Sequence, residues 1–210
     1  MTPVETDPGA CRRICEALLK YRRIVVTSHM RPDGDAVGSS LALAWALREL
    51  GTDARVVHRD RPPLQFADFP GIADVEVGDI IPAGTDAVVV LECGDLARTG
   101  LTGFDTLPVI NIDHHPGNTG YGDVHWFDRT YSACGEMVFE IIAELGVPLT
   151  ADMATHLFMA VVTDTGSFRY PGVSPRTFTI CARLLEAGAD PVSTARRLFD
   201  SHTLGRLRLQ

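Results

Sequence analysis

Three short segments of this sequence combine carboxylate and imidazole side chains: residues 29–35 (His-Met-Arg-Pro-Asp-Gly-Asp), residues 113–115 (Asp-His-His) and residues 163–166 (Thr-Asp-Thr-Gly). Each follows a run of apolar or β-branched residues, so we expect each in a loop at the end of a buried strand. Such a mixture of oxygen and nitrogen ligands suits a pair of divalent metals such as Mn²⁺. Because two metals that hold one phosphate are a recurrent means of hydrolysing phosphoesters, the segments predict a metal-dependent phosphoesterase.

The first segment can bring an imidazole and two carboxylates together. Pro32 and Gly34 interrupt regular structure there, which allows His29, Asp33 and Asp35 to converge. One division places His29 and Asp33 on a first metal and Asp35 on a second. Taken alone, Asp35 fits equally well an aspartate that caps the helix after it.

The second and third segments supply further candidates. Adjacent side chains point in different directions, so one of His114 and His115 is expected to bind metal and the other to face the phosphate as donor or acid. We expect Asp113 and His115 to be the catalytic residues. Alternatively, both histidines are structural and only form hydrogen bonds with the backbone. Asp164 ends an apolar run and is a further candidate ligand.

Apolar strands alternate with helices along the chain. Strands are expected at 22–27, 54–58, 86–91 and 108–112, and helices at about 36–50 and 132–145 and after Thr150, Ser174 and Asp190. This order predicts an α/β fold, a parallel sheet with helices on both faces. Ligands of such sheets gather beyond the carboxyl ends of the strands, where the polar segments fall.

Composition narrows the possible partners and locations. The 210 residues carry a net charge of −8 and show no basic stripe, which argues against binding to long nucleic acid but not against a short nucleotide substrate. No apolar run is long enough to span a membrane, and no secretory signal is recognisable. Five scattered cysteines indicate no disulfide framework, so we expect a cytoplasmic protein.

These segments resemble the motifs of the DHH phosphoesterase superfamily, from the His-x-x-Pro-Asp-Gly-Asp-Ala-x-Gly-Ser segment at 29–39 to Thr-Asp-Thr-Gly-Ser-Phe at 163–168. Their order and spacing resemble the bacterial branch that degrades very short RNA and dephosphorylates 3′-phosphoadenosine 5′-phosphate. The resemblance runs from about Tyr21 to the end of the chain. It implies a parallel α/β domain with two Mn²⁺ ions, for which Mg²⁺ or Co²⁺ are alternatives.

The resemblance also implies a division of the ligands. The first metal would take His29 and Asp33; the second would take Asp35, His114 and Asp164; a carboxylate after the third strand would bridge them; and His115 would face the phosphate. Ser167, from its turn, and Arg169 are candidate contacts to the substrate, although an exposed arginine usually lies free in solvent.

The sequence departs from the family pattern in two places. Glu92 stands where the family usually has a bridging aspartate, and Asp95 follows three positions later as an alternative. In addition, relatives carry a C-terminal substrate-binding domain with a glycine-rich segment, which is absent here. We therefore expect a DHH-type domain over residues 1–190 and the start of a linker helix over 191–210.

Several functions remain open on these observations. The leading hypothesis is hydrolysis of short oligoribonucleotides, 3′-phosphoadenosine 5′-phosphate, or both. A cyclic-dinucleotide phosphodiesterase and a pyrophosphatase or polyphosphatase are alternatives within the enzyme class, and a nucleotide- or metal-binding module without turnover is the alternative outside it. The expected partner is a short oligonucleotide or nucleotide phosphate, with no membrane; a homodimer is a further expectation from the resemblance.

Overall fold

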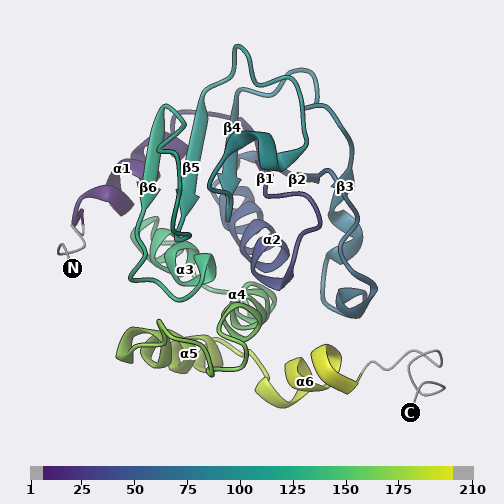
Figure 1. Ribbon diagram of the computed structural model, residues 1–210, viewed down its shortest axis with the longest axis vertical. Coiled ribbons are helices and arrows are strands. Elements are labelled where there is room, and N and C mark those ends of the chain that lie inside the picture. The colour runs from purple at the N-terminus through teal and green to yellow at the C-terminus, as the bar shows by residue number, and fades with distance from the viewer. Residues whose placement is uncertain (1–6, 201–210) are drawn as a thin grey trace.

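The computed structural model describes residues 7–200 and is built around a six-stranded parallel sheet with the strand order β3-β2-β1-β4-β5-β6 (Figure 1). The strands are β1 (Arg23–Thr27), β2 (Asp53–His58), β3 (Glu76–Val77), β4 (Ala87–Leu91), β5 (Val109–Asp113) and β6 (Val124–Phe127). The α-helices are α1 (Ala10–Leu18), α2 (Gly34–Glu49), α3 (Cys134–Glu144), α4 (Ala151–Asp164), α5 (Pro175–Glu186) and α6 (Pro191–Ala195). The expected α/β fold with a parallel sheet is confirmed.

The two faces of the sheet are covered unequally. Helices α1, α2 and α3 pack on one face, where Val26 and Ile112 belong to the larger apolar core. The opposite face has a smaller core around Val25 and Val88, closed mainly by the chain at residues 96–107. That segment begins with the short 3-10 helix η3 (Leu96–Thr99). Both faces therefore carry helical structure, but the long helices share one of them.

Helix α2 lies between the sheet and α4, and most of its residues are buried. Glycines make the close approach possible. A Cβ atom at Gly38 would lie 2.5 Å from the carbonyl oxygen of His156, and one at Gly135 of α3 would lie 2.7 Å from Cβ of Ala160. Helices α5 and α6 pack on α4, so that α4, α5 and α6 form a further helical layer (Figure 1).

The expected helix starts are confirmed by their capping contacts. The side chain of Thr150 accepts a hydrogen bond from the amide of Met153 at the start of α4. A capping box between Ser174 and Thr177 begins α5, and Asp190 caps α6. These contacts satisfy amide groups that a helix N-terminus otherwise leaves unpaired.

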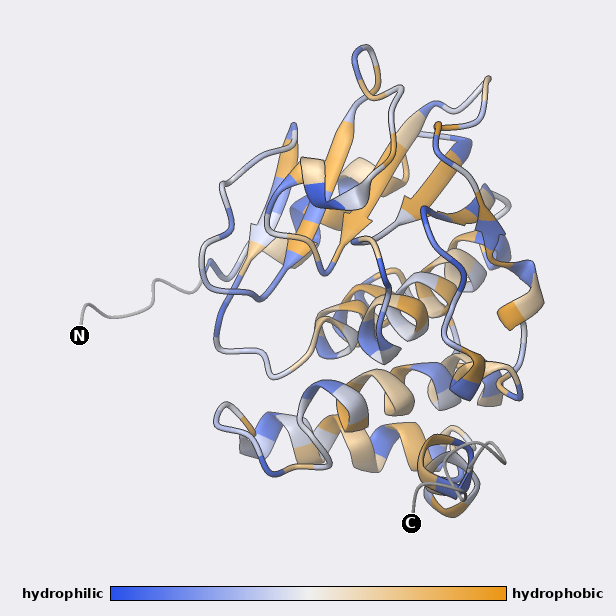
Figure 2. Ribbon diagram, turned by 45° about the vertical axis from the view of Figure 1, so that its right-hand side comes forward, coloured by the Kyte–Doolittle hydropathy of each residue, from blue (hydrophilic) through white to orange (hydrophobic). Residues whose placement is uncertain are grey.

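The strands are strongly apolar along most of their length, as expected for a sheet that is covered on both faces (Figure 2). Among the residues that the structure describes, no helix combines the length and the apolar character needed to cross a membrane.

Two features differ from the sequence-based expectations. Strands β3 and β6 were not predicted; two 3-10 helices, η1 (Leu64–Phe66) and η2 (Ile72–Asp74), lie in the connection between β2 and β3. The segment 163–166 lies at the end of helix α4 and not after a strand, so that prediction was wrong. Of the expected linker, α6 and a π-helical turn (Arg196–Asp200) occupy the first part, and residues 201–210 lie outside the described chain.

Candidate metal centre

Four acidic and imidazole side chains meet at the carboxyl edge of the sheet and form what we call the central cluster. It consists of Asp35 in the first turn of α2, Glu92 after β4, His114 after β5 and Asp164 at the end of α4. One ligand atom of each lies within 4.8 Å of those of the others. The Nε2 atom of His114 is 3.2 Å from Oε2 of Glu92, 3.3 Å from Oδ2 of Asp164 and 3.9 Å from Oδ2 of Asp35.

Asp35 is held in place by the helix that it caps. Its side chain is fully buried and accepts hydrogen bonds from the amides of Cys134, at 2.6 Å, and Gly135, at 2.9 Å, at the start of α3. The aspartate that caps α2 is Asp33, whose Oδ1 atom accepts from the amide of Ala36. Asp35 is thus a helix cap, but for α3, and this contact links α2 and α3 at the cluster.

Glu92 enters the cluster from a strained backbone. Its φ angle is 56°, a left-handed conformation that costs a non-glycine residue about 1–3 kcal/mol. Within residues 7–200 its buried Oε2 atom has no hydrogen-bond partner, because the hydrogen bond with Nε2 of His114 is made by Oε1. An unpartnered buried carboxylate oxygen is what a metal ligand leaves when no ion is present. Asp95, the alternative bridging residue, instead caps η3 through the amide of Ala97.

The central cluster combines three carboxylates with a single imidazole, so its acidic groups outnumber its basic one. Burial raises the pKa of Asp35 well above its usual value, and the charges of Glu92 and Asp164 raise it further. Burial and the charge of Glu92 raise the pKa of Asp164 to about 6. Burial opposes protonation of His114, yet its hydrogen bond with Glu92 and the surrounding carboxylates raise its pKa to about 10. Divalent cations would supply the positive charge that these carboxylates lack.

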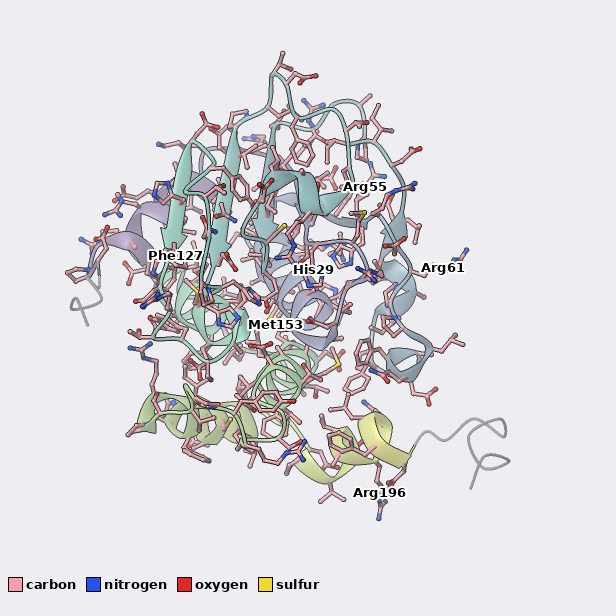
Figure 3. The ribbon with its side chains drawn as sticks, in the orientation of Figure 1. His29, Arg55, Arg61, Phe127, Met153 and Arg196 are labelled. Carbon is pink, nitrogen blue, oxygen red and sulfur yellow. The ribbon has the colours of Figure 1, made fainter. Side chains whose placement is uncertain are left out.

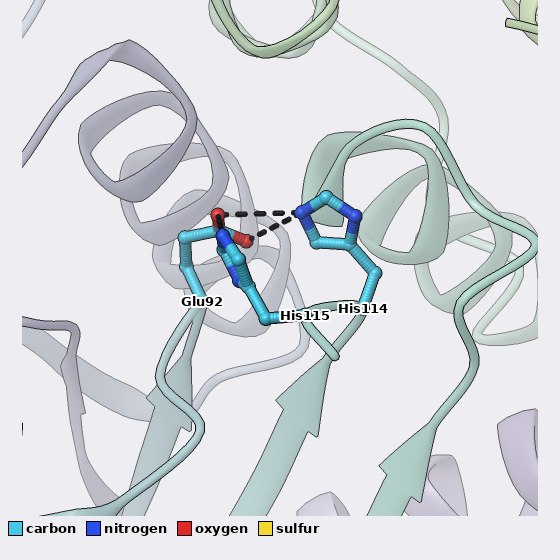
Figure 4. A group of neighbouring side chains, drawn as sticks. All are labelled: Glu92, His114 and His115. Carbon is cyan, nitrogen blue, oxygen red and sulfur yellow. Dashed lines mark hydrogen bonds and ion pairs between the residues drawn. The ribbon is translucent and has the colours of Figure 1, made fainter. Parts of the chain in front are cut away.

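His115 lies beside the central cluster and shares Glu92 with it (Figure 4). Its Nε2 atom is 3.4 Å from Oε1 of Glu92. On the opposite side of the ring, Nδ1 lies 3.0 Å from Oδ1 of the buried Asp113, and this hydrogen bond raises the pKa of His115. The imidazole rings of His114 and His115 differ in orientation by 50°. Asp113 therefore orients His115 and does not itself reach the cluster.

His29 and Asp33 form a separate pair next to the central cluster. His29 lies in the loop between β1 and α2 (Figure 3), and its Nε2 atom is 3.8 Å from Oδ2 of Asp33. Its Nδ1 atom is 2.8 Å from the carbonyl oxygen of Met30, which leaves Nε2 available as a ligand atom. The charge of Asp33 contributes to the raised pKa of Asp164, so the pair and the cluster are electrostatic neighbours.

The two candidate substrate contacts lie outside the central cluster. Ser167 has a left-handed backbone, with a φ angle of 61°, in the turn after α4. Arg169 is exposed, and its Nε atom donates a hydrogen bond to the carbonyl oxygen of Gly166 at 2.6 Å. In this structure the guanidinium is thus bonded to its own turn.

A cavity of about 440 Å³ opens next to the central cluster, with His114 and Asp164 in its wall. Three residues that sequence analysis missed also line it: Arg129, Tyr131 and Tyr170. Gly166 gives the last of these room, because a Cβ atom there would lie 2.5 Å from the Tyr170 ring. A glycine followed four residues later by an aromatic residue is too common a pattern to have indicated this contact.

Glu136 lies in the first turn of α3. Its side chain is fully buried. The carboxylate accepts hydrogen bonds from the hydroxyl group of Ser132 at 2.7 Å and from the Ser132 amide at 3.1 Å. It therefore fixes the chain leading into α3.

Comparison with known proteins agrees with this geometry. The sequence profile described as "DHH family, N-terminal domain" matches residues 23–161. The bifunctional oligoribonuclease and PAP phosphatase NrnA of Thermus thermophilus is 35% identical over 178 residues, 83% of this chain and 53% of that protein. Its namesake from Bacillus subtilis is 29% identical, over 79% of this chain and 53% of the relative. The chain thus spans about half the length of these relatives.

Among solved structures, an exopolyphosphatase-related protein from Bacteroides fragilis superposes with a TM-score of 0.88 at 24% identity, covering all of this chain and 65% of its own. A putative family II inorganic pyrophosphatase from Methanococcus jannaschii gives a TM-score of 0.59 at 18% identity, covering 79% and 56%. These similarities show a shared fold. The profile match over residues 23–161 and the 35% identical relative show that the chain belongs to the DHH family.

Proposed function

We propose that this chain is the catalytic part of a metal-dependent phosphoesterase that hydrolyses short oligoribonucleotides, 3′-phosphoadenosine 5′-phosphate, or both. The observation that carries the proposal is the central cluster, in which three carboxylates and an imidazole converge at the carboxyl edge of the sheet. The name of the 35% identical relative supports the choice of substrate. Since the chain spans about half of that relative, the activity is proposed for this domain and not carried over from the whole protein.

The donor groups fit two divalent ions. His29 and Asp33 would hold the first ion, and Asp35, His114 and Asp164 the second, with Glu92 between them through its unpartnered Oε2 atom. Mixed imidazole and carboxylate ligands suit Mn²⁺, with Mg²⁺ or Co²⁺ as alternatives. When bound, such ions neutralise phosphoryl oxygens and lower the pKa of water.

The remaining residues of the site would bind and orient the substrate. The hydrogen bond to Asp113 fixes the ring of His115 with Nε2 towards Glu92, and from there Nε2 would face a bound phosphate. The neighbouring cavity has the volume of a small-molecule site. Arg129 would supply positive charge to a phosphate at its rim, and Tyr131 and Tyr170 offer aromatic surface to a nucleoside. Ser167 and Arg169 remain candidate contacts should the turn after α4 rearrange on binding.

The partners, location and oligomeric state of the protein are also part of what we propose. Its partners would be short oligonucleotides or nucleotide phosphates and not long nucleic acid, in keeping with the net charge of −8. A cytoplasmic location and a homodimer complete the proposal.

The test is Mn²⁺-dependent release of phosphate from 3′-phosphoadenosine 5′-phosphate and of mononucleotide from a linear diadenylate. Asp164→Asn removes one charge of the central cluster and is expected to lower turnover at least about 100-fold. Asp152→Asn is the matched control, since Asp152 is an exposed aspartate of the same helix. Mn²⁺ binding is measured separately by calorimetry.

Other substrates distinguish the alternatives. Hydrolysis of pyrophosphate or of a cyclic dinucleotide, without turnover of the linear adenosine substrates, would contradict the proposed specificity. Mn²⁺ binding without turnover of any of these substrates would favour a binding module.

A further inference from the structure

A buried polar network lies under the metal centre, on the face of the sheet away from the long helices. At its middle is Asn111 of β5, which is fully buried. Its Nδ2 atom donates to the carbonyl oxygens of Val90, at 3.1 Å, and Cys93, at 3.2 Å. Its amide thus joins β5 to the end of β4 and to the loop that carries Glu92. A buried asparagine in an apolar sheet is costly unless its hydrogen bonds are made.

One arm of the network leads from Asn111 to His115. The Nδ2 atom of Asn118 donates to Oδ1 of Asn111 at 2.9 Å and to Oδ2 of Asp113 at 2.7 Å. The Oδ1 atom of Asn118 accepts from the amide of Gly120 at 2.7 Å, so the orientation of this side-chain amide is fixed on both sides. With Oδ2 occupied in this way, Asp113 presents Oδ1 to Nδ1 of His115.

The other arm leads to Glu92. The hydroxyl group of Tyr121 donates to the carbonyl oxygen of Cys93 at 2.7 Å and accepts from Nδ2 of Asn111 at 2.9 Å. The amide of Glu92 itself donates to the carbonyl oxygen of Ile112. Hydrogen bonds therefore hold the chain immediately before and after the strained φ angle of Glu92. A left-handed glutamate persists only when its surroundings impose that conformation.

We propose that Asn111, Asn118 and Tyr121 act as one set of positioning residues for the reaction: through Asp113 they orient His115, and through the Cys93 carbonyl group they aim Glu92 into the central cluster. This inference rests on the proposed function. None of the three residues reaches the central cluster itself, so each acts through a neighbour. Because both arms meet at the Asn111 side chain, the place of His115 is tied to that of Glu92.

Two variants separate the arms. Asn118→Ala removes the contact that occupies Oδ2 of Asp113, which frees that carboxylate to rotate. Tyr121→Phe removes a single hydroxyl group and keeps the ring, which packs on the smaller core. Tyr21→Phe is the matched control, since the Tyr21 ring packs on the larger core. Thermal unfolding of each variant shows whether the fold is retained.

The first measurement uses metal-free protein and needs no turnover. Nitrogen-15 NMR of the histidine rings, assigned with His115→Gln, reports which ring nitrogen of His115 carries the proton. The wild type and Tyr21→Phe are expected to show one pattern, with the proton on Nδ1. Asn118→Ala is expected to show a changed pattern, because Asp113 no longer holds one orientation.

The second measurement follows Mn²⁺ binding and turnover. Tyr121→Phe is expected to weaken Mn²⁺ binding by about 10–100-fold through Glu92, and Asn118→Ala to lower kcat by a similar factor while Mn²⁺ binding is kept. Asn118→Ala and Tyr121→Phe proteins that match the wild type in ring pattern and Mn²⁺ affinity, and differ only in melting temperature, would overturn the inference. If the wild type turns over no phosphoester, but Asn118→Ala changes the ring pattern and Tyr121→Phe weakens Mn²⁺ binding, the proposed function fails and the positioning network stands.

Discussion

Glu92 combines burial, charge and backbone strain in a single residue. Its φ angle of 56° turns the chain out of β4. From there, the longer glutamate side chain places its oxygens 3.2 and 3.3 Å from Nε2 of His114. Glutamate in place of the family's usual aspartate therefore still delivers a carboxylate to the central cluster. The arrangement supports the proposal that Glu92 lies between two metals.

We predict that Glu92→Gln lowers the pKa of His114 in metal-free protein. The pKa of about 10 depends on the hydrogen bond and charge of Glu92, against the opposing effect of burial. Removing a neighbouring charge of opposite sign is expected to lower it by about 1–3 pH units. An NMR titration of the His114 ring measures this, with Glu186→Gln, a change at an exposed glutamate, as control. An unchanged titration would contradict the assigned electrostatics.

Candidate site residues could be predicted from the sequence where several imidazole and carboxylate side chains stand close together in the chain. His29, Asp33 and Asp35 stand within seven residues, and the pair of histidines at 114 and 115 is adjacent. Asn118 and Tyr121 gave no such signal, because polar residues in a glycine-containing loop ordinarily lie in solvent. Their role arises from contacts with another loop, which no local pattern contains.

At the scale of elements, continuous apolar runs identified β1, β2, β4 and β5, whereas β6 was missed because it is short and includes a histidine. The apolar run before Asp164 belongs to the buried α4 and not to a strand. A short apolar run does not by itself distinguish a strand from a buried helix. Asp164 nonetheless reaches the central cluster, because α4 ends at the carboxyl edge of the sheet.

We predict that Gly38→Ala destabilises the protein, although alanine favours helix by about 1 kcal/mol over glycine. The added Cβ atom would lie 2.5 Å from the backbone oxygen of His156, so α2 and α4 must move apart. Overpacking of this kind costs about 1–3 kcal/mol, which urea unfolding would show. Because Asp35 and Asp164 lie on these two helices, Mn²⁺ affinity should fall as well.

Gly78→Ala is the matched control, because a Cβ atom there meets no atom nearer than 3.9 Å. A Gly38→Ala protein with unchanged stability and unchanged Mn²⁺ affinity would show that the spacing of α2 and α4 does not set the metal centre.

At the scale of the whole molecule, buried histidines tie distant segments to the helical layers. Nε2 of His156 in α4 lies 2.6 Å from the carbonyl oxygen of Pro70, between two aromatic neighbours, Trp45 and Phe69. His58, at the end of β2, lies 3.2 Å from the hydroxyl group of Ser40 in α2. Burial lowers the pKa of His58 to about 3 and that of His156 to about 4. In the folded chain at neutral pH both rings are therefore uncharged.

We predict that these histidines make the fold sensitive to acid. The pKa of His156 is lower in the folded chain, at about 4, than the ordinary histidine value of 6.5. Between these values the unfolded chain binds a proton that the folded chain does not. The stabilisation is therefore complete above pH 6.5 and is lost as pH falls towards 4, by about 2 kcal/mol between pH 7 and pH 5.

Urea unfolding at both pH values should show this loss in the wild type and a smaller one in His156→Gln, whose amide can still donate to Pro70. His125→Gln, at an exposed histidine, should behave as the wild type. Equal losses in His156→Gln and the wild type would show that the acid sensitivity arises elsewhere, with His58 the next group to test.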